Sequence, residues 1–169
     1  MVGAAGRHNA ADGSHGGPLP GLAPAGVREA DELVLPLGSG KTSPISAVDV
    51  ARAAAVILHD PAHHIGRIYI LTGPESVDLN HYAGVFSEAL GRTIRYRDLP
   101  LAEWTERLRR SSVPLYLVNH LTVMSELHKR GRYDRMTDDF YKITGDGPAR
   151  MHDFVKLHAA EFTRREVAA

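Results

Sequence analysis

The sequence predicts an α/β fold that is rich in helix, with about three short strands and about five helices. Apolar residues recur every three to four positions over much of the second half of the chain, which is the spacing of amphipathic helices. Short apolar or alternating runs that end at Gly, Pro or Asp occur in three places, as expected for strands. The length of 169 residues fits one domain.

The first 30 residues predict a disordered tail. Residues 1–26 hold seven of the 16 glycines and three of the ten prolines, and Arg7 and Asp12 are their only formal charges. Such a segment cannot bury enough apolar surface to offset the entropy lost on ordering it. We therefore expect a Gly-, Ala- and Pro-rich disordered tail over residues 1–30 and a folded lobe over residues 31–165.

Three segments have the composition of strands. Residues 33–35 are an apolar run that ends at Pro36. Residues 67–71 contain Ile, Tyr, Ile and Leu before Gly73, which predicts a buried strand. Residues 93–98 alternate apolar and charged side chains, which predicts a half-buried strand.

The helices are predicted from their end signals and their apolar faces. Ser46 followed by Asp49 has the spacing of a capping box, and the Ala-rich helix that follows ends before Pro61. Asp78 and Gly91 are suited to begin and end the next helix. Further helices are predicted over residues 101–108, 112–131, 137–145 and 151–162.

Composition excludes several classes of function. Lys and Arg total 20 and Asp and Glu total 20, so the chain lacks the cationic surplus typical of nucleic-acid binding. The absence of Cys excludes disulfides, thiolate nucleophiles and Cys-ligated metals. No apolar stretch approaches the ~18 residues of a membrane span, and the first residues lack the apolar run of a signal peptide. We expect a cytoplasmic protein with neither a nucleic-acid nor a membrane partner.

Two Gly-containing segments superficially resemble phosphate-binding loops. Gly40-Lys41-Thr42 lacks the required Gly five residues earlier, where Leu35 stands, and Pro44 occupies the first turn of the helix that should follow. Residues 3–6 (Gly-Ala-Ala-Gly) follow only two residues, too few for the strand of a dinucleotide-binding turn. We therefore predict a plain turn and a flexible terminus, and no cofactor-binding residue.

The ten histidines offer no clear metal site. His59, His63 and His64 surround Pro61, which breaks the helix that would align them, so a solvated cluster at a helix end is expected. His120, together with His128, lies on or near the apolar face of the helix after Pro114, where a half-buried packing role is the simpler prediction. A role for His120 in a cleft stays open.

No catalytic constellation is predicted. None of the six Tyr residues is followed four positions later by Lys, so the acid–base pair of short-chain reductases is absent. No Ser lies in a Gly-x-Ser-x-Gly turn. Asp138-Asp139 stands where a helix N-terminus favours negative charge, which predicts capping and dipole compensation.

Several short motifs nevertheless follow one another in a distinctive order. Residues 35–51 (LPLGSGKTSPISAVDVA) are followed by an Ala-rich helix, then by Leu-Thr-Gly-Pro at 71–74, Leu-Gly-Arg at 90–92, and a Thr-Asp-Asp to Thr-Gly segment at 137–145. Over residues 33–163 this order resembles the C-terminal half of NmrA-like proteins, which are atypical members of the extended short-chain dehydrogenase/reductase superfamily.

The resemblance implies that the chain is the substrate lobe of such a protein, with the NAD(P)-binding Rossmann half missing. It implies no cofactor for this chain alone and NAD(P) for complete family members. A complete member would be an oxidoreductase or a redox-sensing regulator, and this chain would not be catalytic alone. By analogy Pro44, Ile45 and His120 are candidates to line a substrate cleft, although a core-packed turn is the simpler interpretation of Pro44 and Ile45.

Two further hypotheses remain at this point. A lobe built to pack on a Rossmann domain exposes apolar surface without it, so the chain is alternatively an interaction or dimerisation module that pairs with a separate Rossmann domain or forms a homo-oligomer. A third interpretation is a small-molecule binding domain with a pocket lined by Trp104, Tyr116 and His120.

Overall fold

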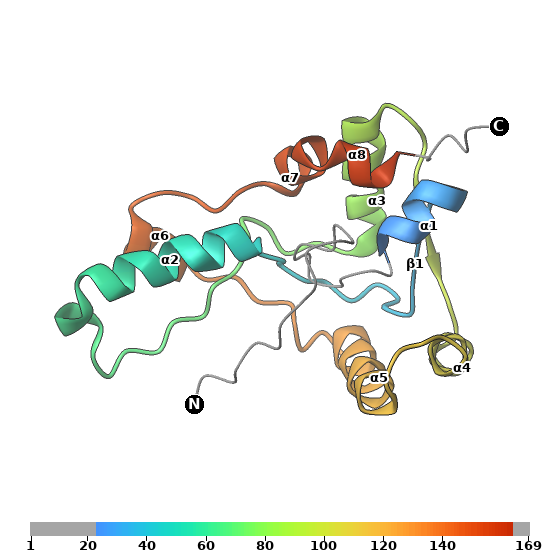
Figure 1. Ribbon diagram of the computed structural model, residues 1–169, viewed down its shortest axis with the longest axis horizontal. Coiled ribbons are helices and arrows are strands. Elements are labelled where there is room, and N and C mark those ends of the chain that lie inside the picture. The colour runs from blue at the N-terminus through green and yellow to red at the C-terminus, as the bar shows by residue number, and fades with distance from the viewer. Residues whose placement is uncertain (1–22, 164–169) are drawn as a thin grey trace.

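The computed structural model describes residues 23–163 of the chain (Figure 1). This part contains eight α-helices, one 3-10 helix and a two-stranded sheet, which confirms the predicted helix-rich α/β class. Figure 1 shows a body that carries both strands and most helices, and an arm that projects from it. We define the arm as residues 45–74 together with residues 138–146.

The sheet of the body consists of β1 (Glu32–Leu35) and β2 (Arg95–Asp98), which pair in parallel with Leu33 opposite Tyr96. Parallel neighbours require a long crossover connection, and here that connection passes through the arm and through α3 (Leu79–Leu90). The Tyr96 hydroxyl lies 2.9 Å from the carbonyl oxygen of Leu35, to which it donates, and accepts the N–H of Leu37 at 3.1 Å. Tyr96 therefore fixes the point where the chain leaves the sheet.

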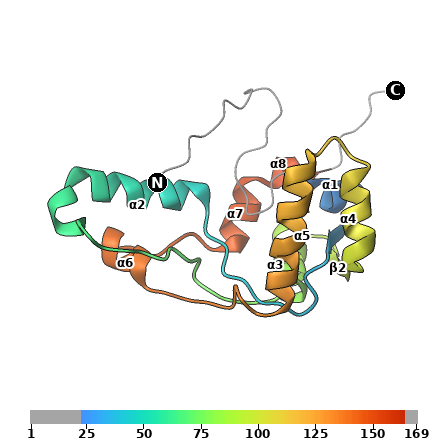
Figure 2. The same cartoon turned by 90° about the horizontal axis from the view of Figure 1, so that it is seen from below.

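Two groups of helices cover the sheet (Figures 1 and 2). α1 (Ala23–Ala30), α3, α7 (Met151–Leu157) and α8 (Ala159–Phe162) form one group, and α4 (Leu101–Arg109) packs against α5 (Leu115–Lys129) in the other. Phe86 and Phe162 meet edge to face with ring centroids 5.2 Å apart. The body core is made of buried apolar side chains from both groups and from β1: Val27, Leu33, Leu35, Tyr82, Phe86, Trp104, Leu108, Val118, Val155 and Phe162.

The arm has a small core of its own. It contains α2 (Ala47–His59), the 3-10 helix η1 (Pro61–His64) and α6 (Asp139–Thr144), with α6 packed against α2 (Figure 2). The buried apolar residues of this core are Ala53, Phe140 and Ile143, and the half-buried residues around them are Ile45, Ile57, Tyr69 and Leu71. Since so few side chains are buried, the arm is a thin layer.

The predicted helix signals are confirmed at α2 and α3. The hydroxyl oxygen of Ser46 accepts the N–H of Asp49 at 3.0 Å, and the carboxylate of Asp78 accepts the N–H of His81 at 2.9 Å. Gly91 ends α3 with a φ of 66°, a left-handed conformation that residues other than Gly rarely adopt.

The strand predicted at residues 67–71 is wrong for the described part of the chain. These residues form no ladder, and the side chain of Ile68 is 90% exposed. A strand exists only through hydrogen bonds to a neighbouring strand, and the pairs formed by the described residues do not include this segment.

Other differences concern the ends of elements. Residues 23–30, which we expected in the tail, form α1 and bury Val27 against β1, while residues 1–22 lie outside the described part. α5 begins at Leu115 rather than after Ser112, with Pro114 at its N-cap. The last predicted helix is divided at His158 into α7 and α8.

Candidate functional site

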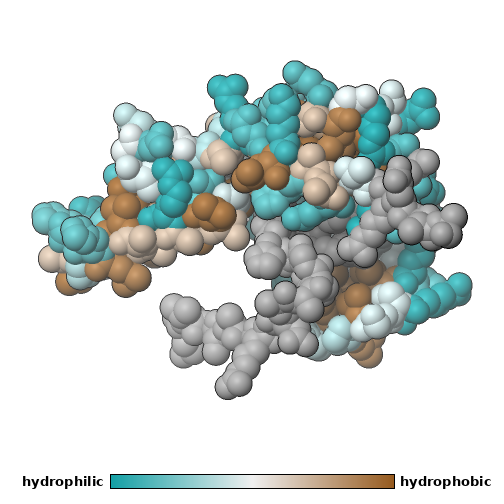
Figure 3. Space-filling view, turned by 45° about the horizontal axis from the view of Figure 1, so that its top comes forward, coloured by the Kyte–Doolittle hydropathy of each residue, from teal (hydrophilic) through white to brown (hydrophobic). Residues whose placement is uncertain are grey.

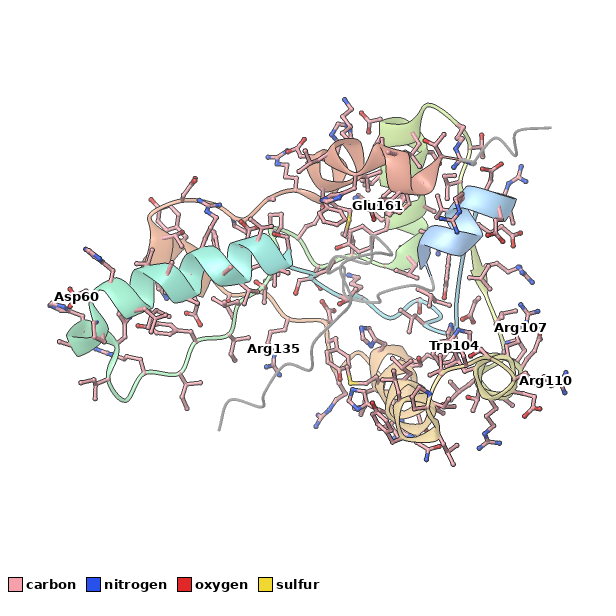
Figure 4. The ribbon with its side chains drawn as sticks, in the orientation of Figure 1. Asp60, Trp104, Arg107, Arg110, Arg135 and Glu161 are labelled. Carbon is pink, nitrogen blue, oxygen red and sulfur yellow. The ribbon has the colours of Figure 1, made fainter. Side chains whose placement is uncertain are left out.

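Three stretches of chain cross where the arm meets the body, and we call this region the junction (residues 42–46, 72–77 and 134–137). Thr42 and Val77 form an antiparallel bridge with N···O distances of 3.0 and 3.1 Å. The Ser43 carbonyl accepts the N–H of Gly73 at 3.0 Å. The Ser43 hydroxyl donates to the Arg135 carbonyl at 2.6 Å. Figure 4 shows Arg135 on the stretch between α5 and α6. The first two segments are thus held together by main-chain hydrogen bonds, and the Ser43 side chain joins the third segment to them.

The backbones in the junction are in direct contact. A Cβ atom added at Gly73 would overlap the carbonyl oxygen of Pro44. Only Gly allows such an approach, which explains the Gly in the Leu-Thr-Gly-Pro motif.

A buried carboxylate joins α2 to a distant segment. Asp49 is 2% exposed, and its carboxylate accepts hydrogen bonds from the Ser46 hydroxyl at 2.8 Å, the Arg52 guanidinium at 2.9 Å and the Ala149 N–H at 2.9 Å. Arg52 also donates to the exposed Asp146 at 3.1 Å. The hydrogen bond that Arg52 donates to Asp49 is the main cause that raises the pKa of Arg52. All described partners of Asp49 are structural, so the predicted capping role is confirmed and extended to residue 149.

The three predicted cleft residues do not gather at one place. Pro44 and Ile45 are half-buried in the junction, where Ile45 packs on the arm core. His120 is exposed on α5, whose C-terminal end, near His128, contacts the loop at Gly40. Eight residues of helix separate His120 from that end, which is about 12 Å at the rise of an α-helix. A cleft that includes all three residues stays a prediction.

The three side chains proposed to line a small-molecule pocket have different surroundings. Trp104 lies on α4 (Figure 4) and is buried in the body core. Tyr116 and His120 are exposed on α5. The described residues therefore do not place Trp104 and Tyr116 on a common wall.

The comparisons with known proteins give a consistent result. No protein-family model matches the sequence. Over 136 residues the chain is 31% identical to the NAD(P)H azoreductase of Xenophilus azovorans, covering 80% of this chain and 47% of that protein. It is 29% identical over 126 residues to an uncharacterized oxidoreductase of Bacillus subtilis, covering 75% of this chain and 44% of that protein. The chain spans about half the length of the curated relatives it matches.

Solved structures share the fold. A nucleoside-diphosphate-sugar epimerase from Staphylococcus aureus superposes with a TM-score of 0.70 at 27% identity, covering 79% of this chain and 46% of that one. An NADPH-dependent quinone oxidoreductase from Escherichia coli gives 0.73 at 21% identity, covering 81% and 50%. NmrA, a negative transcriptional regulator solved with NAD, gives 0.58 at 19% identity, covering 74% and 42%.

The chain matches the C-terminal half of an NmrA-like protein. Its relatives and structural neighbours include NAD(P)H- and NADPH-dependent reductases, an epimerase and the regulator NmrA, so the resemblance seen in the sequence is confirmed. The described helices and parallel strand pair agree with the C-terminal portion of these proteins.

The loop after β1 of this NmrA-like half does not fit a dinucleotide. A Cβ atom at Gly40 would overlap the carbonyl oxygen of His128, so this Gly faces the end of α5 rather than an open cradle. Thr42 is engaged in the bridge to Val77, and α2 begins only at Ala47. A pyrophosphate site needs free backbone N–H groups at a helix N-terminus that directly follows the loop. The second Gly-containing segment, Gly-Ala-Ala-Gly at residues 3–6, lies outside the described residues.

The buried phenols of this NmrA-like half are unsuited to acid–base work. Burial raises the pKa of Tyr82 and of Tyr96 well above the usual range of a phenol, so both keep their protons at neutral pH. Tyr82 donates a hydrogen bond to the Thr42 carbonyl at 3.2 Å, and Tyr96 fixes the end of β1. Both hydroxyls therefore have structural roles.

The histidines form local contacts. His63 lies 2.7 Å from the Asp60 carboxylate at the outer end of the arm, where Figure 4 places Asp60, and His64 lies 2.8 Å from the Tyr69 hydroxyl. His128 stacks on Tyr133 with ring centroids 4.1 Å apart, and burial lowers its pKa. The predicted half-buried position is confirmed for His128, although its stacking partner was not predicted, and is wrong for His120, which is exposed.

The two carboxylates at the start of α6 do not cap it with their side chains. Asp138 forms an ion pair with Lys142 at 2.6 Å, which lowers its pKa, and Asp139 accepts the N–H of Ile70 at 2.8 Å. The predicted capping hydrogen bond is therefore wrong, because each carboxylate has another partner. The predicted dipole compensation agrees with the structure, since Asp138 is the N-cap residue and Asp139 lies in the first turn of α6.

None of the helices in the described part combines the length and apolar composition that crossing a membrane requires.

Proposed function

We propose that this chain supplies the C-terminal half of an NAD(P)-dependent oxidoreductase and acts only together with an NAD(P)-binding half. The observation that carries this proposal is the coverage of the azoreductase match, which includes 80% of this chain but 47% of that protein. The loop after β1 supports the same view, since it offers no seat for the pyrophosphate of the cofactor. The chain alone is then inactive, and the complete protein is a reductase or a redox-sensing regulator.

Within this proposal Pro44 and Ile45 are the residues of this half that face substrate, with His120 as a more distant contributor. The junction fits this role because its backbone is fixed by hydrogen bonds from three chain segments. Rigid support of this kind is what a binding site on a loop needs.

Titration with NADPH tests the proposal. We expect no saturable binding to the 169-residue chain at micromolar NADPH, whereas the intact Xenophilus azoreductase serves as the positive control. Mixing the chain with the separately expressed N-terminal half of that azoreductase should produce azo-dye-dependent NADPH oxidation that neither part shows alone. Micromolar NADPH affinity of the 169 residues by themselves would overturn the proposal.

The second candidate function is an interaction module that pairs with a separate Rossmann domain or with itself. The observation that favours it is the apolar outer face of α2, whose exposed residues are Ala47, Val48, Ala51, Ala54, Ala55 and Leu58. Sedimentation of the chain at low micromolar concentration separates the two cases. A clean monomer with no tendency to associate with itself would count against the module.

A further inference from the structure

The stretch that leads from α5 to the junction concentrates positive charge in a chain that is neutral overall. Residues 129–135 read Lys-Arg-Gly-Arg-Tyr-Asp-Arg, so four of the seven side chains are cations and one is an acid. Lys129 and Arg130 lie in the last turn and at the C-cap of α5, where positive charge compensates the helix dipole. Since that effect ends with the last turn, it does not account for Arg132 and Arg135.

The first two of these cations have charged partners and the last two do not. Lys129 and Arg130 form ion pairs with acidic side chains of β2 and α5. Arg132 and Arg135 are exposed, and in the part of the chain that the structure describes their guanidinium groups form neither an ion pair nor a hydrogen bond. These two groups are therefore available to an anion from outside the chain.

The acidic residues closest to Arg135 in the sequence have other partners. The Asp134 carboxylate accepts the Ser76 hydroxyl at 2.8 Å, and Asp138 pairs with Lys142 at 2.6 Å. Neither carboxylate binds the guanidinium of Arg135, so this side chain can take a ligand without first breaking an ion pair.

The backbone around Arg135 is fixed in the junction. Its carbonyl accepts the hydroxyl of Ser43 at 2.6 Å, and two residues further on the N–H of Thr137 donates to the hydroxyl of Thr72 at 3.2 Å. Only the side chain of Arg135 then has to become ordered when a ligand binds, which lowers the entropic cost of binding.

Arg135 lies next to the residues proposed to face substrate. Its partner Ser43 directly precedes Pro44, and Figure 4 places Arg135 between the arm and α5. Lys41, which is exposed and has no ion pair within residues 23–163, lies two positions before Ser43 on another crossing segment. Cations gathered around a site raise the local concentration of anions.

The surface beside Arg135 is apolar. Met136, the next residue, is 57% exposed although its side chain is large and apolar. The arm begins at the half-buried Ile45, and Figure 3 shows hydrophobic side chains gathered along it. Sites for organic ligands combine apolar walls with a few fixed polar groups. The ligand that fits both features has an apolar body and an anionic end.

We propose that Arg135 is a specificity-determining residue that binds the carboxylate or sulfonate group of an otherwise apolar substrate. This inference rests on the proposed function, because the apolar part of that substrate then lies against Pro44 and Ile45. The planar guanidinium donates two parallel N–H bonds to two oxygens of such a group, which an ammonium group cannot do. Arg132 and Lys41 attract the substrate through their charge.

Titration with a matched pair of dyes tests this subsite. One probe is an azobenzene with a carboxylate para to the azo group, and the other has a neutral carboxamide there. Both are titrated into the 169-residue chain alone and into its mixture with the separately expressed N-terminal half of the Xenophilus azoreductase. We expect the carboxylate dye to bind about tenfold more tightly and to shift the Nε–H NMR signal of Arg135 saturably.

Two variants of equal charge change complete the titration. Arg135→Gln should remove the preference for the carboxylate dye while the circular dichroism stays the same, because the exposed guanidinium holds no other described residue. Arg109→Gln is the matched control, since Arg109 is exposed on α4 and its guanidinium also has no partner among the described residues. This variant should keep the full preference.

The phosphates of NADPH are the other anions that such a guanidinium could bind, and steady-state kinetics of the mixture distinguish the two sources. Arg135→Gln should raise KM for the carboxylate dye by about tenfold, with kcat and the KM for NADPH unchanged. A raised KM for NADPH with an unchanged dye preference would assign Arg135 to the cofactor and overturn the inference.

The remaining outcomes separate this inference from the proposed function. If the mixture oxidises NADPH with dye but shows no preference for the carboxylate, or keeps that preference in Arg135→Gln, the subsite is wrong and the proposed function stands. If folded halves are inactive together while the chain alone prefers the carboxylate dye through Arg135, the proposed function is wrong and the anion subsite stands. No preference in either the chain or the mixture overturns the subsite.

Discussion

Asp49 belongs to the capping box at the start of α2 and also binds a distant segment of the chain. Its carboxylate accepts hydrogen bonds from Ser46 at the N-cap of α2, from Arg52 within α2, and from the N–H of Ala149, 100 positions further along the chain. A buried charge is tolerated only when its hydrogen-bonding capacity is satisfied, as it is here by three donors. The same side chain therefore stabilises α2 and attaches the segment that leads to α7.

Asp49→Asn should lower the free energy of unfolding by about 2 kcal/mol, because a charge-assisted contact is lost and an amide N–H₂ faces donors. Urea unfolding followed by circular dichroism measures the change. Asp146→Asn is the matched control, since Asp146 also binds Arg52 but is 72% exposed, and it should change the midpoint far less. Equal effects of the two variants would show that burial of Asp49 is not what matters.

His128 should make stability depend on pH. Burial lowers its pKa in the folded chain, so the unfolded chain binds a proton more readily. Stability is therefore present above the ordinary histidine pKa of about 6.5 and is lost as pH falls below it. His128→Phe, which keeps an aromatic ring against Tyr133, should show a smaller loss of urea midpoint between pH 7.5 and pH 5.5, each about one unit from that pKa.

His63→Phe provides the comparison for this pH dependence. His63 is exposed on the arm and does not contact Tyr133, so the pH dependence that we assign to His128 should persist in this variant. A pH dependence that survives in His128→Phe would assign it to other groups.

Among the elements, the junction depends on one Gly that cannot carry a side chain. Gly73→Ala should destabilise the chain by more than about 2 kcal/mol, because its Cβ would overlap the Pro44 carbonyl and neither backbone can move freely. Gly84→Ala, on the exposed side of α3 with nothing within 4 Å of the added Cβ, should stabilise by about 0.5–1 kcal/mol through helix propensity. Thermal unfolding of both variants measures the opposite signs, and destabilisation by both would contradict this reason.

Elements with local signals were predictable from the sequence, and those that depend on distant partners were not. α2 and α3 have their capping residues within four positions of the helix start, so Ser46 and Asp78 identified them. α1 was missed because its Gly- and Ala-rich sequence is weakly apolar and only tertiary packing of Val27 on the body reveals it. A predicted strand at 67–71 fails for the opposite reason, since a ladder needs a partner that local sequence does not specify.

In the candidate site, too, contacts between near neighbours in the sequence were predictable, and contacts between distant residues were not. The pairing of Ser46 with Asp49 was predicted from spacing, whereas the bond from Asp49 to Ala149 joins residues 100 positions apart. The distance between His120 and the junction could not be derived from periodicity, which places residues on a helix face but not on the same side of the molecule.

On the scale of the whole molecule, the arm exposes apolar surface that the body does not match. The double variant Leu58→Lys/Ile68→Lys should bind markedly less of a hydrophobic dye such as ANS while its far-ultraviolet circular dichroism stays the same, because both side chains are largely exposed. The double variant Leu115→Lys/Leu157→Lys replaces largely exposed Leu side chains of the body and should reduce dye binding less. Similar loss in both would show that the dye does not recognise the arm.

The bonds of Asp139 and Thr137 to Ile70 have a consequence for how far assembly can proceed. A strand with two vacant sides is a template on which molecule after molecule can stack into a fibre. Here one side is already occupied by side-chain hydrogen bonds, so this segment cannot extend a stack in both directions.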